Sequence, residues 1–204
     1  MTTHTFDRTI LETPVRVIPL GHLSHDDRGY FVSVGGNPGG QLRGVRIPAQ
    51  HRSFYEAQTP ARRAAPDPTS DAAQLLLDMA NAGILAPLPE NVPLEDLSLI
   101  PVLRSELEVI EDLGEDGVRV RASDKEFTLP TLATLFLPHV DGHRTLAEIG
   151  ELVRQQISRD AGAEFLANAA EELHSTPDEL LASAALTLAS EMRPAGAATF
   201  EWAD

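Results

Sequence analysis

Two capping boxes set where helices begin in the second half of the chain. Each is a threonine followed three residues later by a glutamate, at Thr145 and Glu148 and again at Thr176 and Glu179. In such a box the threonine hydroxyl and the glutamate carboxylate each accept a hydrogen bond from the other residue's backbone N–H. Pro177 occupies the favoured first helical position of the second box. The sequence therefore predicts a helix directly after each threonine.

Apolar residues behind the first cap recur with helical spacing. Leu146, Ile149, Val153 and Ile157 are three or four positions apart and would share one face of a helix. Similar stripes precede and follow this segment. The helices expected in this half are residues 131–137, 146–157, 161–174 and 177–192.

Three short strands are expected before these helices. Val118, Val120 and Ala122 alternate with polar residues, which is typical of a half-buried strand. A glycine-flanked turn at residues 114–117 joins them to alternating apolar positions over 103–109. A third strand ends at Leu129 and leads into the helices. The second half is therefore predicted to contain three strands followed by three or four helices.

The first half is predicted to be rich in strands. The strands expected there are residues 14–20, 29–34 and 42–47. Residues 22–28 and the glycine-rich 35–40 are expected to be loops. One helix is expected between Ser70 and Gly83. The predicted organisation is a β-rich region over 1–57, a linker with one helix over 58–101, and a C-terminal domain over 102–204.

The strand–helix segment over residues 118–156 carries a resemblance to a known family. Its central run is Val140-Asp-Gly-His-Arg-Thr-Leu-Ala-Glu-Ile149. It resembles PqqD-like domains, the recognition elements of ribosomal peptide natural-product (RiPP) biosynthesis, in which an apolar helix is followed by Asp-Gly-x-x-Thr and then Glu-Ile or Glu-Leu. These domains belong to the winged-helix superfamily, and the resemblance covers roughly residues 103–192. It implies an α+β fold with a winged-helix-like C-terminal domain.

The resemblance also implies a peptide-binding role. In this family a leader peptide adds as an extra strand beside the third strand and packs on the last helix. Carried onto this chain, the peptide-binding residues are Lys125, Glu126, Phe127, Thr128, Leu129, Leu181 and Ala184. The alternation places Phe127 and Leu129 toward the core and Glu126 and Thr128 outward. The alternative interpretation is that Phe127 and Leu129 serve only as core residues.

The implied protein is a non-catalytic accessory protein. It would bind a precursor peptide and present it to a partner modifying enzyme, with a homodimer as a further option. The alternatives are a winged-helix transcription regulator and an accessory domain or fragment of a JmjC-type oxygenase or methyltransferase, because the same signature occurs there. The region before Pro87 also has three strands and a helix that ends in Gly-Ile-Leu, so it is a candidate degenerate second copy.

The charge of the chain narrows these alternatives. The formal net charge is −15, which disfavours nucleic acid and anionic membranes as partners, because both attract basic proteins. The helix over 146–157 sets Arg154 against Glu148 and Glu151, which also argues against DNA recognition. The polar N-terminus lacks a signal-peptide pattern and no long apolar run is present, so we expect a soluble cytoplasmic protein.

The sequence offers little catalytic chemistry. Cysteine is absent, which removes thiolate metal sites and thiol nucleophiles. His25 and Asp27 have the spacing of adjacent ligands in a 2-His-1-carboxylate iron site, with His51 as the distant ligand, and so leave a small iron-dependent oxygenase as a rival function. The first 65 residues supply too few strands for such an enzyme. We therefore predict no metal, no cofactor and no catalytic residue.

One basic island stands out in the acidic chain. Its arginines lie at positions 43, 46, 52, 62 and 63. The island could contact an acidic peptide. The interpretation that we favour at this point is a contact with the acidic second half of the same chain or of a second copy.

Overall fold

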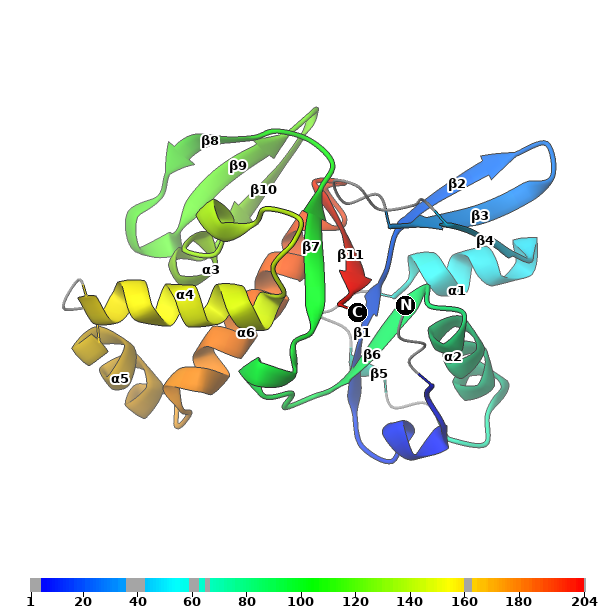
Figure 1. Cartoon of the computed structure of the whole chain (residues 1–204), viewed down its shortest axis with the longest axis horizontal. Helices are drawn as coiled ribbons and strands as arrows, with labels where there is room; N and C mark the ends of the chain where they lie inside the picture. The colour runs from blue at the N-terminus through cyan, green and yellow to red at the C-terminus, as the bar shows by residue number, and fades with distance from the viewer. Residues whose placement is uncertain (1–4, 36–42, 59–62, 65–66, 160–162, 204) are drawn as a thin grey trace. The chain divides into compact units, whose positions relative to one another are not determined.

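The computed structural model describes residues 5–35, 43–58, 63–64, 67–159 and 163–203. The fold is mixed α+β, as predicted. The chain divides into two compact units, an N-terminal unit of residues 1–90 and 199–204 and a C-terminal unit of residues 91–198 (Figure 1). Each unit is described by itself.

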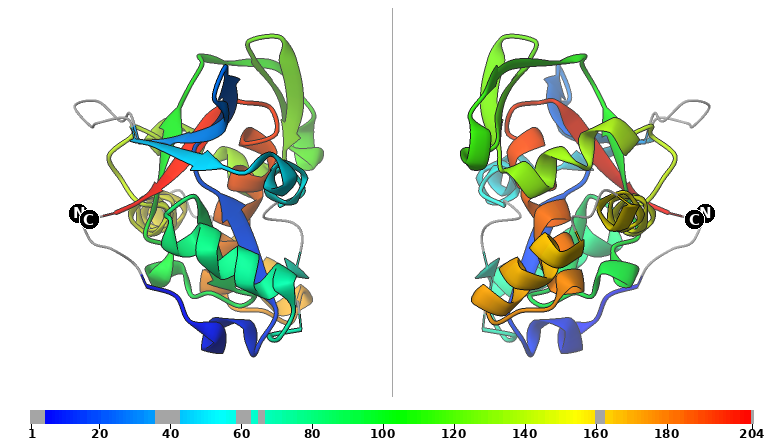
Figure 2. Two further views of the ribbon diagram at one scale, coloured as in Figure 1. Left: turned by 90° about the vertical axis from the view of Figure 1, so that its right-hand side faces the viewer. Right: turned by 90° about the vertical axis from the view of Figure 1, so that its left-hand side faces the viewer.

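The N-terminal unit contains two small antiparallel sheets and two helices. Its strands are β1 (Val15–Pro19), β2 (His22–Asp26), β3 (Gly29–Val34), β4 (Arg43–Ile47), β5 (Arg63–Ala64) and β6 (Leu85–Pro89), and its helices are α1 (Arg52–Glu56) and α2 (Asp71–Asn81). One sheet has the order β5-β1-β6 and the other β2-β3-β4. The second of these is the blue to light-blue ribbon in Figure 2 (left).

The expected linker over residues 58–101 is not a separate region. Strand β6 pairs antiparallel with β1 from Val15↔Pro89 to Pro19↔Leu85, so the segment before residue 90 belongs to the N-terminal unit. Residues 91–101 belong instead to the C-terminal unit. The predicted boundary at 57/58 was placed from local composition. Local composition cannot reveal the pairing of β1 with β6, because these strands are about 70 residues apart in sequence.

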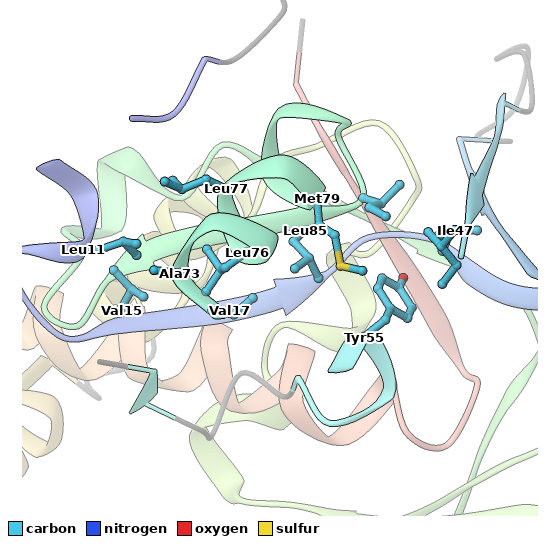
Figure 3. Close-up of a cluster of buried hydrophobic side chains, with 12 residues drawn as sticks. Leu11, Val15, Val17, Ile47, Tyr55, Ala73, Leu76, Leu77, Met79 and Leu85 are labelled. Carbon is cyan, nitrogen blue, oxygen red and sulfur yellow. The ribbon is translucent and has the colours of Figure 1, made fainter. Parts of the chain in front are cut away.

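The core of the N-terminal unit explains why α2 belongs to it. Val15 and Val17 of β1 pack with Leu76 of α2 in one cluster of buried side chains (Figure 3). Tyr55 of α1 is fully buried in the same cluster, and its hydroxyl donates a hydrogen bond of 2.5 Å to the carbonyl oxygen of Leu20. At the edge of this unit, the rings of Phe6 and Trp202 lie 6.0 Å apart.

Residues 22–28 were expected to form a loop, but most of them form β2. Its register with β3 runs from His22↔Ser33 to Asp26↔Gly29. The turn itself is confined to residues 27 and 28. The prediction was wrong because His22, Ser24 and Asp26 are polar, so β2 shows no apolar alternation and Leu23 alone packs against the core.

A charged pair bridges this sheet. Arg46 of β4 donates two hydrogen bonds to the Asp26 carboxylate, at 2.9 and 2.7 Å, and the Arg28 backbone N–H donates a third. These bonds, led by those from Arg46, lower the pKa of Asp26 to about 2. Because the pKa of Asp26 is lower in the folded state, the ionised carboxylate stabilises the fold at pH values above its ordinary pKa of 3.8. This stabilisation is lost as the pH falls toward 2.

Replacing Arg46 with Gln should therefore raise the pKa of Asp26 toward its ordinary value, as measured by NMR titration of the carboxyl carbon. Arg28→Gln is the matched control, because its backbone N–H still donates and the pKa should stay low. A pKa that stays near 2 in Arg46→Gln would contradict the role of the guanidinium.

The C-terminal unit begins with strands and continues with helices, in the predicted order. Its strands are β7 (Leu99–Leu103), β8 (Leu107–Asp112), β9 (Val118–Ala122) and β10 (Lys125–Leu129), and its helices are α3 (Thr131–Thr134), α4 (Leu146–Arg159), α5 (Ala163–Glu172) and α6 (Pro177–Met192). A last strand, β11 (Ala198–Trp202), begins at the unit boundary. Strands β8, β9 and β10 form an antiparallel sheet in that order, and α6 packs against β10, α3, α4 and α5 (Figures 1 and 2).

Both predicted capping boxes are confirmed. The Glu148 and Glu179 backbone N–H groups donate to the Thr145 and Thr176 hydroxyls at 3.1 and 3.2 Å. The threonine N–H groups donate back to the carboxylates at 2.8 and 2.7 Å. Hydrogen bonds from the Thr176 N–H and then the Ser175 hydroxyl lower the pKa of Glu179. The helix starts at residues 146 and 177 thus follow from local chemistry.

Replacing Thr145 or Thr176 with Ala should lower the free energy of unfolding by about 0.5–2 kcal/mol in each case. The measurement is urea unfolding followed by far-ultraviolet circular dichroism. Thr187→Ala is the control, because this residue lies inside α6, where alanine is the better helix former. Equal stability of the two cap variants and the control would show that the caps do not set these helices.

Candidate functional site

Strand β10 lies at one end of its sheet. Among the residues that the structure describes, β10 pairs with β9 and with no other strand, through five consecutive pairs from Lys125↔Ala122 to Leu129↔Val118. A strand in this position presents a row of backbone N–H and C=O groups on its outer side, ready to pair with another extended chain. Because the register is regular, the backbone N–H and C=O groups on the outer side of β10 are regularly spaced. The outer side of β10 is therefore a template for an added strand.

The other end of the sheet, β8, is less suited to strand addition. Its register with β9 shifts between Val109 and Glu111, so the edge is bulged. It also carries the carboxylates of Glu108, Glu111 and Asp112. Bulges and charged side chains are the features that keep edge strands from pairing with other chains. Of the two edges, β10 is the better template.

The side chains of β10 alternate as the sequence predicts. Lys125, Glu126 and Thr128 are exposed, whereas Phe127 and Leu129 are buried in the core, at 9% and 0% exposure. The two apolar residues hold the strand against the body of the unit. An added peptide would meet the backbone of β10 and the exposed side chains.

The two α6 residues assigned to the site are closed to solvent. Leu181 is 0% and Ala184 is 7% exposed. Helix α6 packs against three other helices as well as β10, so its apolar residues are used on several sides. After the first turn of α6, Ser183 is its one exposed residue. Leu181 and Ala184 therefore belong to the core of the C-terminal unit and do not form an open surface.

An ion-pair network fixes the outer face of this sheet. Arg121 of β9 contacts Glu126 of β10 at 2.9 Å and Glu108 of β8 at 3.2 Å. Arg119 of β9 contacts Glu111 of β8 at 2.8 Å. Exposed pairs like these add little stability. They join side chains of all three strands, and the alternation of arginines in β9 with acids in β8 and β10 is the sequence pattern that could have predicted them.

The first residue of β10 is tied to the end of α6. The Lys125 ammonium donates a hydrogen bond of 3.1 Å to the carbonyl oxygen of Pro194, just beyond that helix. A cation at the C-terminus of a helix is favourable because the last carbonyl groups carry partial negative charge. This contact anchors the start of β10 beside α6.

The histidine-containing candidate for an iron site is divided between elements. His25 lies in β2 and faces the ring of Tyr30 at 6.1 Å, Asp27 lies in the following turn, and His51 lies in a short 3₁₀ turn before α1. Within the part of the chain that the structure describes, no group of three or more histidine, aspartate or glutamate side chains is placed to hold a metal ion.

No helix among the described residues combines the length and the apolar composition that a membrane crossing requires. Comparisons of the chain with protein-family models, with curated proteins and with solved structures gave no match.

Proposed function

We propose that this chain is a peptide-binding accessory protein whose site is the outer edge of β10. An extended segment of a precursor peptide adds there as a fourth strand. The bound peptide is presented to a separate modifying enzyme in the biosynthesis of ribosomal peptide natural products, in the cytoplasm. The biosynthetic setting comes from the resemblance of residues 140–149 to PqqD-like recognition elements.

The observation that carries the proposal is the contrast between the two edges of one sheet. Strand β8 is bulged and acidic, whereas β10 is regular and is backed by the buried helix α6. A sheet that protects one edge and leaves the other regular can accept a strand on one side only. That one-sidedness suits a peptide-presenting protein, because it confines the guest to one edge of the sheet.

The expected affinity follows from the chemistry of strand addition. Each backbone hydrogen bond contributes about 0.5–1.5 kcal/mol net, so a short strand gains a few kcal/mol from pairing alone. A micromolar complex corresponds to about 8 kcal/mol, and side-chain contacts must supply the difference. Glu126 and Thr128 are the exposed β10 side chains beside the middle of the guest.

The experiment begins with a phage-displayed library of random peptides selected on the full chain. The enriched peptide is synthesised and titrated by calorimetry into wild type, Thr128→Ala and Thr128→Pro. Proline removes a backbone donor and distorts the ladder, whereas alanine keeps the backbone intact. We expect Thr128→Pro to weaken binding by at least about tenfold, or 1.4 kcal/mol, and Thr128→Ala to change it by less than that.

Two measurements guard this test. Circular dichroism and the urea midpoint must show that Thr128→Pro is folded. A proline placed in α6, such as Ser183→Pro, cannot serve as a control variant because it would break the helix. If the folded Thr128→Pro binds the selected peptide as tightly as wild type does, β10 is not the site.

A further inference from the structure

The last helix of each unit ends in the same way. After α2, the Gly83 N–H donates to the Ala80 carbonyl at 2.8 Å and the Ile84 N–H to the Met79 carbonyl at 3.0 Å. After α6, the Gly196 N–H donates to the Arg193 carbonyl at 2.9 Å and the Ala197 N–H to the Met192 carbonyl at 2.9 Å. The two glycines have φ values of 69° and 72°. Both helices thus close with a glycine-centred Schellman motif.

The residue after each of these glycines makes an equivalent contact. The Ile84 carbonyl accepts from the N–H of Leu20, the residue that follows β1, at 2.9 Å. The Ala197 carbonyl accepts from the N–H of Arg104, the residue that follows β7, at 2.8 Å. In both units the chain therefore leaves its last helix and meets the end of its first strand.

The order of elements between these points also matches. Each unit has a 3₁₀ turn, a first strand, a three-stranded antiparallel sheet of consecutive strands, helical segments, and a last helix that ends in the glycine motif. The sheet is β2-β3-β4 in one unit and β8-β9-β10 in the other. The differences lie before the last helix, where the N-terminal unit has the two-residue strand β5, paired with β1, and the C-terminal unit has α4 and α5. By this order, β4 corresponds to β10 and α2 to α6.

The correspondence extends to one side-chain contact. The first residue of β10, Lys125, donates to the Pro194 carbonyl beyond α6. The first residue of β4, Arg43, donates through Nη2 to the Ala82 carbonyl at the end of α2, at 2.6 Å. A cation at the start of the third sheet strand is tied to the end of the last helix in both units. Nothing in the local sequence requires this coincidence.

From these matches we infer that the N-terminal unit repeats the architecture of the C-terminal unit, and that β4 is a second strand-addition edge whose guest is an acidic extended peptide. The inference adds a second site to the proposed function and does not rest on it, because the β4 edge is argued from its own geometry and charge.

The geometry of β4 fits strand addition. Within the described part of the chain, β4 pairs with β3 and with no other strand, through five consecutive pairs from Tyr30↔Ile47 to Val34↔Arg43. Its side chains from Arg43 to Arg46 are exposed or half-buried. Gly44 has room for a side chain: of the described atoms, a Cβ placed there would meet Phe31 Cδ2 alone, at 3.8 Å. The middle of this edge is therefore accessible to a guest strand.

The charge of β4 selects the guest. The strand carries Arg43 and Arg46 and no carboxylate. Arg43 donates to a neutral carbonyl oxygen, so its positive charge is not cancelled by that contact. Arg46 is already paired with the Asp26 carboxylate, at 2.7 Å, so the charge that a guest carboxylate would meet is that of Arg43, at the first position of β4. By contrast, the C-terminal unit holds about two-thirds of the chain's 31 acidic residues and half of its 16 basic ones, so an acidic guest favours β4 over β10.

The absence of cysteine from the chain allows a direct test by disulfide trapping. The probe is a synthetic peptide that repeats Val-Val-Glu-Glu and carries one central cysteine as a mixed disulfide with thionitrobenzoate. A thiolate introduced by Gly44→Cys attacks the peptide sulfur, forms the protein–peptide disulfide and releases thionitrobenzoate, whose absorbance gives the rate. Thr128→Cys tests β10 in parallel, and Ala167→Cys, on the exposed face of α5, gives the rate of unguided collision.

We expect the acidic probe to react with Gly44→Cys at least about tenfold faster than with Ala167→Cys, within the range that electrostatic guidance and docking provide. A probe of the same charge with proline in place of one valine of each repeat cannot form a strand and should lose this advantage. Adding Arg43→Gln to the Gly44→Cys variant should slow trapping, whereas Lys125→Gln should not.

Equal rates at Gly44→Cys and Ala167→Cys, or an equally fast reaction of the proline probe, would overturn the inference. Trapping at Gly44→Cys together with a Thr128→Pro variant that still binds the selected peptide would contradict the proposed function alone. The two ideas can therefore fail separately.

Discussion

Replacing Phe136 with Ala is expected to lower the free energy of unfolding by about 3–5 kcal/mol. Phe136 follows α3 and is fully buried, at 0% exposure, among the largest closed side chains of the protein. Removing its ring leaves a cavity that the surrounding helices cannot fill without losing their own contacts. The measurement is urea unfolding followed by far-ultraviolet circular dichroism.

Phe165→Ala is the matched control for this substitution. It removes the same ring from α5, where the side chain is 70% exposed. Surface changes of this kind usually stay within about 0.5 kcal/mol. Similar losses in the two variants would mean that Phe136 does not fill the core of the C-terminal unit as the structure describes.

Replacing Gly117 with Ala is expected to cost about 3 kcal/mol or more, and to disturb β10. Gly117 has φ 107° and ψ −141°, a backbone conformation that residues with a side chain rarely adopt and that costs about 1–3 kcal/mol by itself. An added Cβ would also lie 1.9 Å from the carbonyl oxygen of Leu129, the last residue of β10. The backbone must move to relieve this collision.

Gly114→Ala separates the two causes. Gly114 lies in the same turn with φ 66°, but a Cβ there meets nothing within 4 Å. Its substitution should cost only the left-handed penalty of about 1–2 kcal/mol. The Gly117→Ala variant should also lose affinity for the peptide selected on wild type, and Gly114→Ala should keep it. If both variants are equally stable, the close approach of Gly117 to Leu129 is incorrect.

The helices of the C-terminal unit could be predicted closely from sequence. Helix α6 begins at Pro177 and ends at Met192, as expected, because a capping box at one end and a proline–glycine stretch at the other are local features. The segment expected as one helix over 131–137 is instead α3 followed by a 3₁₀ turn that contains Pro138. The end of a helix could therefore be predicted where it depends on residues that are neighbours in sequence.

The strands were harder to predict because their partners are distant in sequence. Strand β2 was missed since its residues are mostly polar, and β6 was not assigned to the first region since its partner β1 lies far back in the chain. At the candidate site, the alternation of β10 was predictable. The bulge in β8 and the burial of Leu181 and Ala184 were not, because both depend on how whole elements pack.

The division into two units separates the natural fluorophores of the chain from most of its helix. Trp202, Tyr30 and Tyr55 are the tryptophan and the two tyrosines of the sequence, and all three belong to the N-terminal unit. The four helices α3 to α6 belong to the C-terminal unit. Intrinsic emission therefore comes from residues of one unit, while helical ellipticity comes mainly from the other. Coincident unfolding curves from emission and ellipticity would indicate one cooperative transition. Different midpoints would indicate that the two units unfold independently.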